Sequence, residues 1–198
     1  MKMSPAIPTL KSFHLPPIAA LRGCMKQSTV QPTRREQTFR EDEIIVSKTD
    51  IKGVITYANK TFLDISGYTE EELLGQPHNI IRHPEMPQCV FKLLWDTLLQ
   101  RQEIFAYVKN MCKNGDYYWV FAHVTPTYGA ANRIIGYHSN RRVPDRHQVQ
   151  MFEGIYARLR AEEKRHSDWR RGMEAAGQML MNMVAEKNMS YDEFMFAV

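Results

Sequence analysis

The stretch YANKTFLDISGYTEEELLGQPHNIIRHPEMP, residues 57–87, decides the fold. A short helical pattern begins at Asn59 and stops at Gly67, and Thr69 with Glu72 three positions later is typical of a capping box at the start of a second short helix. A glycine and a proline then interrupt the helical pattern. The stretch therefore predicts two brief helices followed by a loop that further prolines stiffen.

Strand patterns flank this stretch on both sides. Residues 88–100 repeat apolar positions at three-to-four spacing, which predicts one longer amphipathic helix. The Asn114-Gly115 pair supplies the positive-φ residues of a tight hairpin. The expected strands cover residues 43–47, 54–57, 103–112, 117–126 and 133–140. Two strands, three helices and three strands in this order fit several α+β folds.

The chain divides into three expected segments. Residues 1–37 hold five prolines, no hydrophobic periodicity and one acidic residue, which predicts a flexible basic lead-in. Residues 38–143 form the expected domain. Residues 144–198 predict a helical extension for signalling or interaction, with apolar residues along one side of its second helix. This stripe consists of Met173, Ala176, Leu180, Met183 and Val184, and it either docks a partner or packs inside the chain.

Composition excludes several classes of protein. The formal charge is +4, but residues 1–36 carry six basic residues and one acidic residue, a net charge of +5. The remaining residues therefore have a net charge of −1, which does not indicate a basic surface for binding nucleic acid. The apolar runs fall far short of the about 20 residues that a membrane helix needs. Three cysteines without a CxxC spacing indicate neither a zinc site nor a disulfide scaffold. We expect a cytoplasmic protein that binds neither nucleic acid nor membrane.

The motifs together resemble a PAS domain over about residues 40–143. The strings YANKTF at 57–62 and SGYTEEELLG at 66–75 are similar to the front half of such a domain. The string KNGDYYWV at 113–120 is similar to its later hairpin, and IGY at 135–137 is similar to its last strand. This resemblance implies an α+β PAS fold, with a five-stranded antiparallel sheet, short helices on one face and a C-terminal helical extension.

A second resemblance is more specific. The block GQPHNIIRHPEMP at 75–87, followed by aromatic residues on the next helix and by VKN at 108–110, resembles the flavin-binding PAS domain of bacterial aerotaxis receptors. That family typically carries Asp where this chain has Glu85. The resemblance implies noncovalent binding of FAD by Asn59, Arg82, His83, Glu85, Phe91, Trp95, Asn110 and Trp119.

The residue types suit these roles. Arg82 and His83 lie in a proline-stiffened loop, and the guanidinium fork of Arg82 can pair with a pyrophosphate. Trp95 can stack on an isoalloxazine ring, while Asn59 and Asn110 offer amide groups to its polar edge. Each has a structural alternative: Arg82 and His83 as surface ion pairs, Trp95 as a core residue, Asn59 as a helix cap, and Trp119 as hairpin packing.

Other chemistries remain as alternatives. A photoreceptor of the LOV type needs a cysteine about three positions after Gly75, where this chain has His78. Heme b needs an axial histidine, for which His78, His83 or His123 could serve. A third alternative is a cofactor-free module that serves for dimerisation or scaffolding. The sequence contains no glycine-rich phosphate loop, nucleophile elbow, kinase block or pair of histidine and acidic residues at metal-ligand spacing, so we expect a protein that is not an enzyme.

These observations predict a soluble redox or oxygen sensor. Its flavin state would pass through the C-terminal helices to a signalling protein or to a second copy in a homodimer. Aerotaxis receptors continue into membrane segments and a signalling domain that this sequence lacks, so we expect a standalone sensor.

Overall fold

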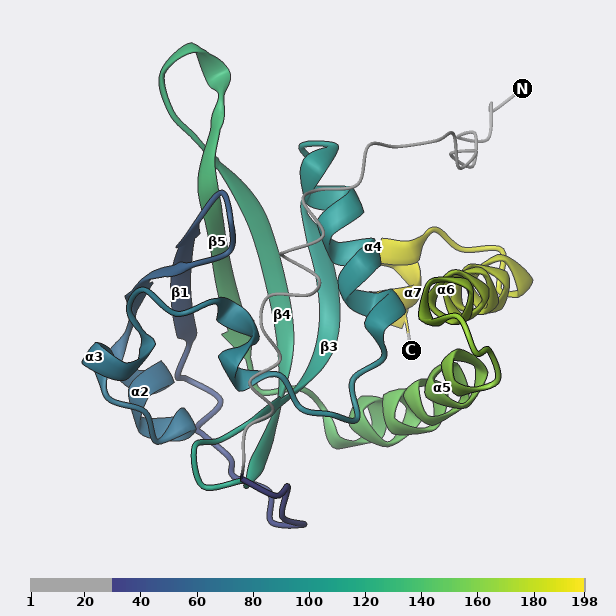
Figure 1. The fold of residues 1–198 in the computed structure, drawn as a ribbon, viewed down its shortest axis with the longest axis horizontal. Helices are drawn as coiled ribbons and strands as arrows, with labels where there is room; N and C mark the ends of the chain where they lie inside the picture. The colour runs from purple at the N-terminus through teal and green to yellow at the C-terminus, as the bar shows by residue number, and fades with distance from the viewer. Residues whose placement is uncertain (1–29, 198) are drawn as a thin grey trace.

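The computed structural model describes residues 30–197, and its centre is one antiparallel sheet of five strands in the order β2-β1-β5-β4-β3 (Figure 1). The predicted α+β fold with a five-stranded sheet is confirmed. The strands are β1 (Ile45–Asp50), β2 (Ile55–Ala58), β3 (Ile104–Met111), β4 (Tyr117–Tyr128) and β5 (Ile134–Arg142).

The helices between β2 and β3 form where local capping allows them. Asn59 accepts the backbone N–H of Phe62 at the start of one helix, and Thr69 forms a complete capping box with Glu72 at the start of the next. A 3-10 turn and a longer helix follow. These elements are α2 (Lys60–Ser66), α3 (Glu70–Leu73), η1 (His78–Ile81) and α4 (Gln88–Leu99).

Strand alternation divides the side chains between two faces of the sheet. Asn110 of β3 pairs with Tyr118 of β4, and the next pair along is Lys109 with Trp119. Successive residues of a strand point to opposite faces, so these two pairs lie on different sides. We call the face that carries Asn110 and Tyr118 the inner face, because α2, η1 and α4 lie over it.

The C-terminal helices cover the β3–β4 part of the other, outer face. The ring of Phe152 stacks on Tyr107 at 4.3 Å between centroids, and Tyr156 donates a hydrogen bond of 2.6 Å to the carbonyl of Tyr107. Further along, Phe196 contacts Phe105 at 4.7 Å. These helices are α5 (Arg146–Lys164), α6 (Trp169–Glu186) and α7 (Tyr191–Ala197), and none of the helices within residues 30–197 is long and apolar enough to cross a bilayer.

The apolar stripe of α6 packs inside the chain. Met173, Leu180 and Val184 are each at most 3% exposed and belong to the same core as the sheet. Of the two roles left open for the stripe, the structure thus shows intramolecular packing. Helices α5, α6 and α7 thus share one hydrophobic core with the sheet.

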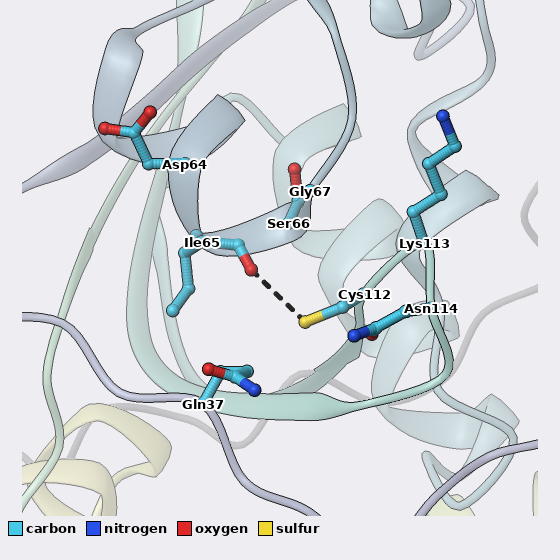
Figure 2. Close-up of a pocket in the computed structure, with 8 residues that line it drawn as sticks. All are labelled: Gln37, Asp64, Ile65, Ser66, Gly67, Cys112, Lys113 and Asn114. Carbon is cyan, nitrogen blue, oxygen red and sulfur yellow. Dashed lines mark hydrogen bonds between the residues drawn. The ribbon is translucent and has the colours of Figure 1, made fainter.

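The hairpin between β3 and β4 packs against the C-terminal end of α2. The thiol of Cys112 lies 3.2 Å from the carbonyl oxygen of Ile65, and the backbone N–H of Lys113 donates to Ser66 at 2.8 Å. An open groove runs along this junction (Figure 2). Its lining consists of Gln37, Asp64, Ile65, Ser66, Gly67, Cys112, Lys113 and Asn114, a set that includes none of the residues expected to bind a cofactor.

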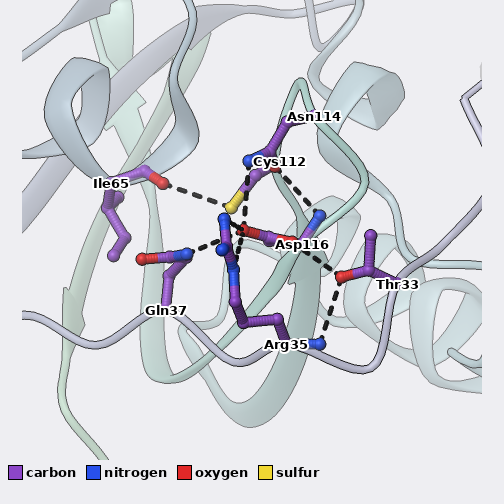
Figure 3. Close-up of polar contacts among 7 residues, drawn as sticks. All are labelled: Thr33, Arg35, Gln37, Ile65, Cys112, Asn114 and Asp116. Carbon is purple, nitrogen blue, oxygen red and sulfur yellow. Dashed lines mark hydrogen bonds and ion pairs between the residues drawn. The ribbon is translucent and has the colours of Figure 1, made fainter.

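Residues 30–37 are held against the same hairpin, so contacts with the domain extend to residues before the expected boundary at 38. Buried Asp116 accepts hydrogen bonds from Thr33 at 2.7 Å, Arg35 at 2.9 Å and Gln37 at 2.7 Å (Figure 3). Residues 30–37 belong to the segment expected to be a flexible lead-in, and here one acidic residue far along the chain accepts hydrogen bonds from three of their side chains. Residues 1–29 lie outside the described part.

We predict that Asp116→Asn lowers the melting temperature at pH 7 and that this difference shrinks as the pH falls. The hydrogen bond from Thr33, followed by those from Arg35 and the other donors, holds the pKa of Asp116 well below its ordinary value of about 4. A depressed folded-state pKa gives stability that is present above the unfolded pKa and is lost as the pH falls through the folded one. Thermal melts at pH 7 and pH 3 measure the effect.

The matched control for this prediction is Asp64→Asn, which removes an exposed carboxylate that pairs with Lys60 on the surface of α2. Exposed pairs contribute little, so this variant should melt close to the wild type at both pH values. Equal losses in the two variants would contradict the account.

Candidate functional site

The space between the inner face and the helices collects polar side chains from several strands. Asn110 and Tyr118 lie on β3 and β4, and Arg141 of β5 pairs across the sheet with Ala122, four residues after Tyr118 on the same face. All three are at most 5% exposed. This is the region where the short helices of the 57–87 stretch cover the sheet.

Arg141 is the central member of this group, and the sequence reasoning did not select it. Its side chain is buried, its Nη2 donates to the hydroxyl of Ser47 on β1, and its guanidinium carbon lies 4.6 Å from the ring centroid of Phe62. Within residues 30–197, its Nε and Nη1 have no hydrogen-bond partner. Burial lowers the pKa of Arg141 to about 10, so the side chain still carries its charge at neutral pH.

His78 of η1 borders the same guanidinium. Its Nε2 lies 3.0 Å from the hydroxyl of Ser47 and 3.5 Å from Nη2 of Arg141. Burial, and then the positive charge of Arg141, lower the pKa of His78 to about 3. The imidazole is therefore neutral at physiological pH and provides no countercharge for Arg141.

Arg82 provides a second cationic side chain, next to the edge strand β3. Residue 82 bridges Asn110 on the edge strand β3, and its guanidinium carbon lies 3.8 Å from the ring centroid of Phe91 on α4. Burial lowers the pKa of Arg82 to about 10. Among the described residues, none accepts a hydrogen bond from its buried Nε. The structure thus brings Arg82, Phe91 and Asn110 together.

His83 and Glu85 follow Arg82 in sequence but turn to the outer face. Glu85 accepts a 2.6 Å hydrogen bond from Lys109, and the ring of His83 meets Tyr117 edge-on at 5.9 Å. Lys109 and Tyr117 alternate with the inward residues of their strands. Burial, and then Lys109, lower the pKa of His83 to about 4. The block that was expected to act together is therefore divided between the two faces.

The two tryptophans expected at the site are also separated. Trp95 of α4 meets Tyr137 of β5 edge-on at 5.2 Å on the inner face. A Cβ at Gly53 would lie 3.2 Å from its ring, so the indole packs directly on that glycine, which has a φ of +79°. Trp119 lies on the outer face, where it stacks on Tyr156 with 6.1 Å between ring centroids.

Asn59 uses its amide for the backbone. Its oxygen accepts the N–H groups of Phe62 at 3.1 Å and Val46 at 2.9 Å, and its nitrogen donates to the carbonyl of Ile44 at 2.7 Å. The structure gives Asn59 the capping role that was weighed as the alternative. In doing so it ties the start of α2 to β1.

The arrangement fits a polar ligand rather than a metal. Buried donors without acceptors carry a desolvation cost that a ligand with acceptor atoms would remove. Such orphaned atoms, within residues 30–197, include Nε and Nη1 of Arg141, Nε of Arg82, Oη of Tyr118 and Oγ1 of Thr49. No group of three or more His, Cys, Asp or Glu side chains within that range is arranged to hold a metal ion.

Comparison with known proteins gives this architecture its class. The family described as PAS fold matches residues 55–141. Together with the five-stranded sheet and its covering helices, this match gives residues 55–141 a PAS fold.

Several known proteins are similar to this chain. The aerotaxis receptor of Escherichia coli is 40% identical over 129 residues, which cover 65% of this chain and 25% of that receptor. A nitrogen fixation regulatory protein of Klebsiella pneumoniae is 30% identical over 99 residues, 50% of this chain and 20% of that protein. A solved PAS domain from Colwellia psychrerythraea aligns at 22% identity with a TM-score of 0.48, over 51% of this chain and 86% of the other. The chain thus spans a quarter or less of the length of the two curated relatives.

We predict that Arg141→Met does not destabilise the protein when no cofactor is bound. The substitution removes a buried charge that lacks a countercharge, while Ser47 keeps His78 as its hydrogen-bond partner. Replacing buried ionic groups by apolar residues of similar volume is often neutral or stabilising by about 1–4 kcal/mol. Urea unfolding of cofactor-stripped protein measures the change.

Arg142→Met is the control for this comparison, because residue 142 is the exposed neighbour on the same strand. Its free energy of unfolding should stay within about 0.5 kcal/mol of the wild type. If Arg141→Met instead lost more than about 1 kcal/mol, the guanidinium would be a net stabilising group without a ligand, and the inference of an unsatisfied charge would fall.

Proposed function

We propose that this protein is a redox sensor that binds FAD noncovalently between the inner face of the sheet and α4. The observation that carries the proposal is a pair of guanidinium groups, that of buried Arg141 and that of half-buried Arg82, which have buried N–H donors without acceptors and no acidic partner within residues 30–197. FAD combines a planar ring that has carbonyl acceptors with an anionic pyrophosphate. The 40% identity to the aerotaxis receptor supports the same assignment.

The two arginines suit different parts of such a ligand. Arg82 lies in the loop between η1 and α4, where a guanidinium fork can pair with phosphate oxygens. Arg141 lies deeper, beside Ser47 and His78, where a ring edge would reach it. Trp95 and Phe91 on α4 supply apolar faces for the ring. Flavin, when bound, supplies the electron chemistry, and the protein supplies orientation and electrostatics.

Binding would engage α4 directly. Trp95 now contacts Tyr137 across the interior, so a ring placed between the indole and the sheet has to separate these two side chains. Trp95 lies on α4, a helix of twelve residues, so a ring in this position would press directly on that helix. A change in the charge or hydrogen bonding of the ring would therefore act first on α4.

The C-terminal helices are tied to the start of α4. Its N-cap residue, Pro87, has no side-chain hydrogen bond, and Glu163 of α5 instead accepts the backbone N–H of Cys89 at 2.8 Å. On α6, a Cβ at Gly177 would lie 3.8 Å from the Cβ of Cys89. We propose that these contacts transmit the flavin state to α5–α7 and from there to a signalling protein or a second copy of the chain.

We predict that the purified protein is yellow and that heat releases FAD in a ratio close to one per chain. The visible spectrum and chromatography of the released cofactor measure this. A Soret band would instead favour heme, for which His78 is the inward histidine. A colourless protein that cannot be reconstituted with FAD would leave the cofactor-free scaffold and contradict the proposal.

Single substitutions test the pocket. We predict that Trp95→Leu and Arg82→Met each lower FAD affinity by at least tenfold, because they remove the ring face and the cation while the outer face is unchanged. Trp119→Leu and Arg142→Met are matched controls on the outer face and should retain stoichiometric FAD. Circular dichroism melts establish that all four variants fold. Full FAD binding by both pocket variants would remove the assignment.

Substitutions at Glu163 test whether the flavin state is transmitted from α4 to α5. Glu163→Ala should cost about 1 kcal/mol of stability, the usual loss for a missing helix cap, and should leave FAD bound. Hydrogen exchange of α5 in the oxidised and reduced protein should differ in the wild type and in Glu163→Gln, which keeps an acceptor, but not in Glu163→Ala. A redox-dependent difference retained in Glu163→Ala would contradict this route.

A further inference from the structure

The hydrogen bonds around Arg141 leave part of its guanidinium unused. A guanidinium has five N–H donors, and in this structure Nη2 is engaged by Ser47 and lies near His78. The Nε and Nη1 atoms are buried and have no partner among residues 30–197. These two nitrogens carry three N–H donors, one on Nε and two on Nη1, which are free to donate to acceptor atoms of a ligand.

The charges around Arg141 leave it uncompensated. Ser47 on β1 is neutral, His78 on η1 is neutral because burial lowers its pKa to about 3, and the pKa of Tyr118 on β4 is raised by burial, so its phenol is protonated. On α2, Phe62 offers only its ring face. Asp116 is the one buried acid in the described part of the chain, and its carboxylate is taken by Thr33, Arg35 and Gln37.

A buried cation without a countercharge prefers an anion to a neutral acceptor. The Coulomb attraction between unit charges grows as the effective dielectric constant falls, and the cost of burying Arg141 is already present before the ligand arrives. We propose that Arg141, with Ser47 and His78 as its neighbours, forms a subsite for the anionic edge of a planar heteroaromatic ligand and binds the reduced, anionic form of flavin more tightly than the oxidised, neutral form.

This inference rests on the proposed function and adds the direction of the redox response. Reduction of the isoalloxazine ring takes up two electrons and one proton and leaves one negative charge on the ring. A site that binds the anion more tightly shifts the equilibrium toward the reduced state, so Arg141 raises the midpoint potential. Arg141 is a binding residue here, and it takes no part in electron transfer itself.

The experiment is a dithionite titration of wild type, Arg141→Met, Arg141→Lys and Arg142→Met, each loaded with FAD, with a reference dye in the cuvette. Dithionite supplies the two electrons and is oxidised to sulfite, and water supplies the proton. We expect Arg141→Met to lose at least tenfold in preference for reduced over oxidised flavin, which is about 30 mV for a two-electron couple. Arg141→Lys keeps the charge without the guanidinium fork, so its midpoint potential should lie between those of the wild type and Arg141→Met. The midpoint potential of Arg142→Met should match that of the wild type.

The outcomes separate the two proposals. Equal midpoint potentials in wild type and Arg141→Met would overturn the subsite while the flavin function stands. A wild type that binds no flavin would overturn the function, and the subsite is then tested with benzoate, a planar ring with one carboxylate. Benzoate should raise the melting temperature of the wild type and not that of Arg141→Met, and equal shifts would overturn the subsite.

Discussion

Neighbouring residues on β3, β4 and β5 point to opposite faces of one sheet, and the rest of the structure depends on this alternation. It directs Asn110, Tyr118 and Arg141 toward α2 and α4, and it directs Lys109 and Trp119 toward the C-terminal helices. A shift of one residue in the register would exchange the two sets. The same sheet therefore provides a polar interior on one side and an aromatic docking face on the other.

Helix α4 connects the two sides. It carries Phe91 and Trp95 over the inner face, while its first turn is held by Glu163 of α5 and its flank by α6. The C-terminal helices therefore share a hydrophobic core with the sheet and contact α4. In the proposed function, α4 alone would link the ligand to these helices, because it contacts both the inner face and α5 and α6.

Sequence reasoning succeeded where the determinants are local. The capping box of Thr69 and Glu72 and the helical spacing of 88–100 each involve residues close in the chain, and both appear as predicted. The hairpin at Asn114-Gly115 also forms, but only Gly115 of the pair has a positive φ, at +93°. It failed where distant segments decide the outcome. Residues 30–37 lack any periodicity, yet Asp116 holds them in place.

The candidate site shows the same division. Arg82 was selected from its motif, but the pairing of its segment with the edge strand sends His83 and Glu85 to the other face, which the motif does not reveal. Arg141 was missed because the last strand was expected to end at Asn140. Period-two alternation continued from Tyr137 through Ser139 would have placed Arg141 inside, beside Ser47 of a strand 94 residues away.

The most direct test of the central claim is a crystal structure of the purified, yellow protein. The account predicts electron density for a planar three-ring system between Trp95 and the sheet, with an acceptor atom of its edge about 2.7–3.2 Å from Nε or Nη1 of Arg141. An interior filled by side chains, with Trp95 still against Tyr137 and the flavin bound elsewhere, would contradict it.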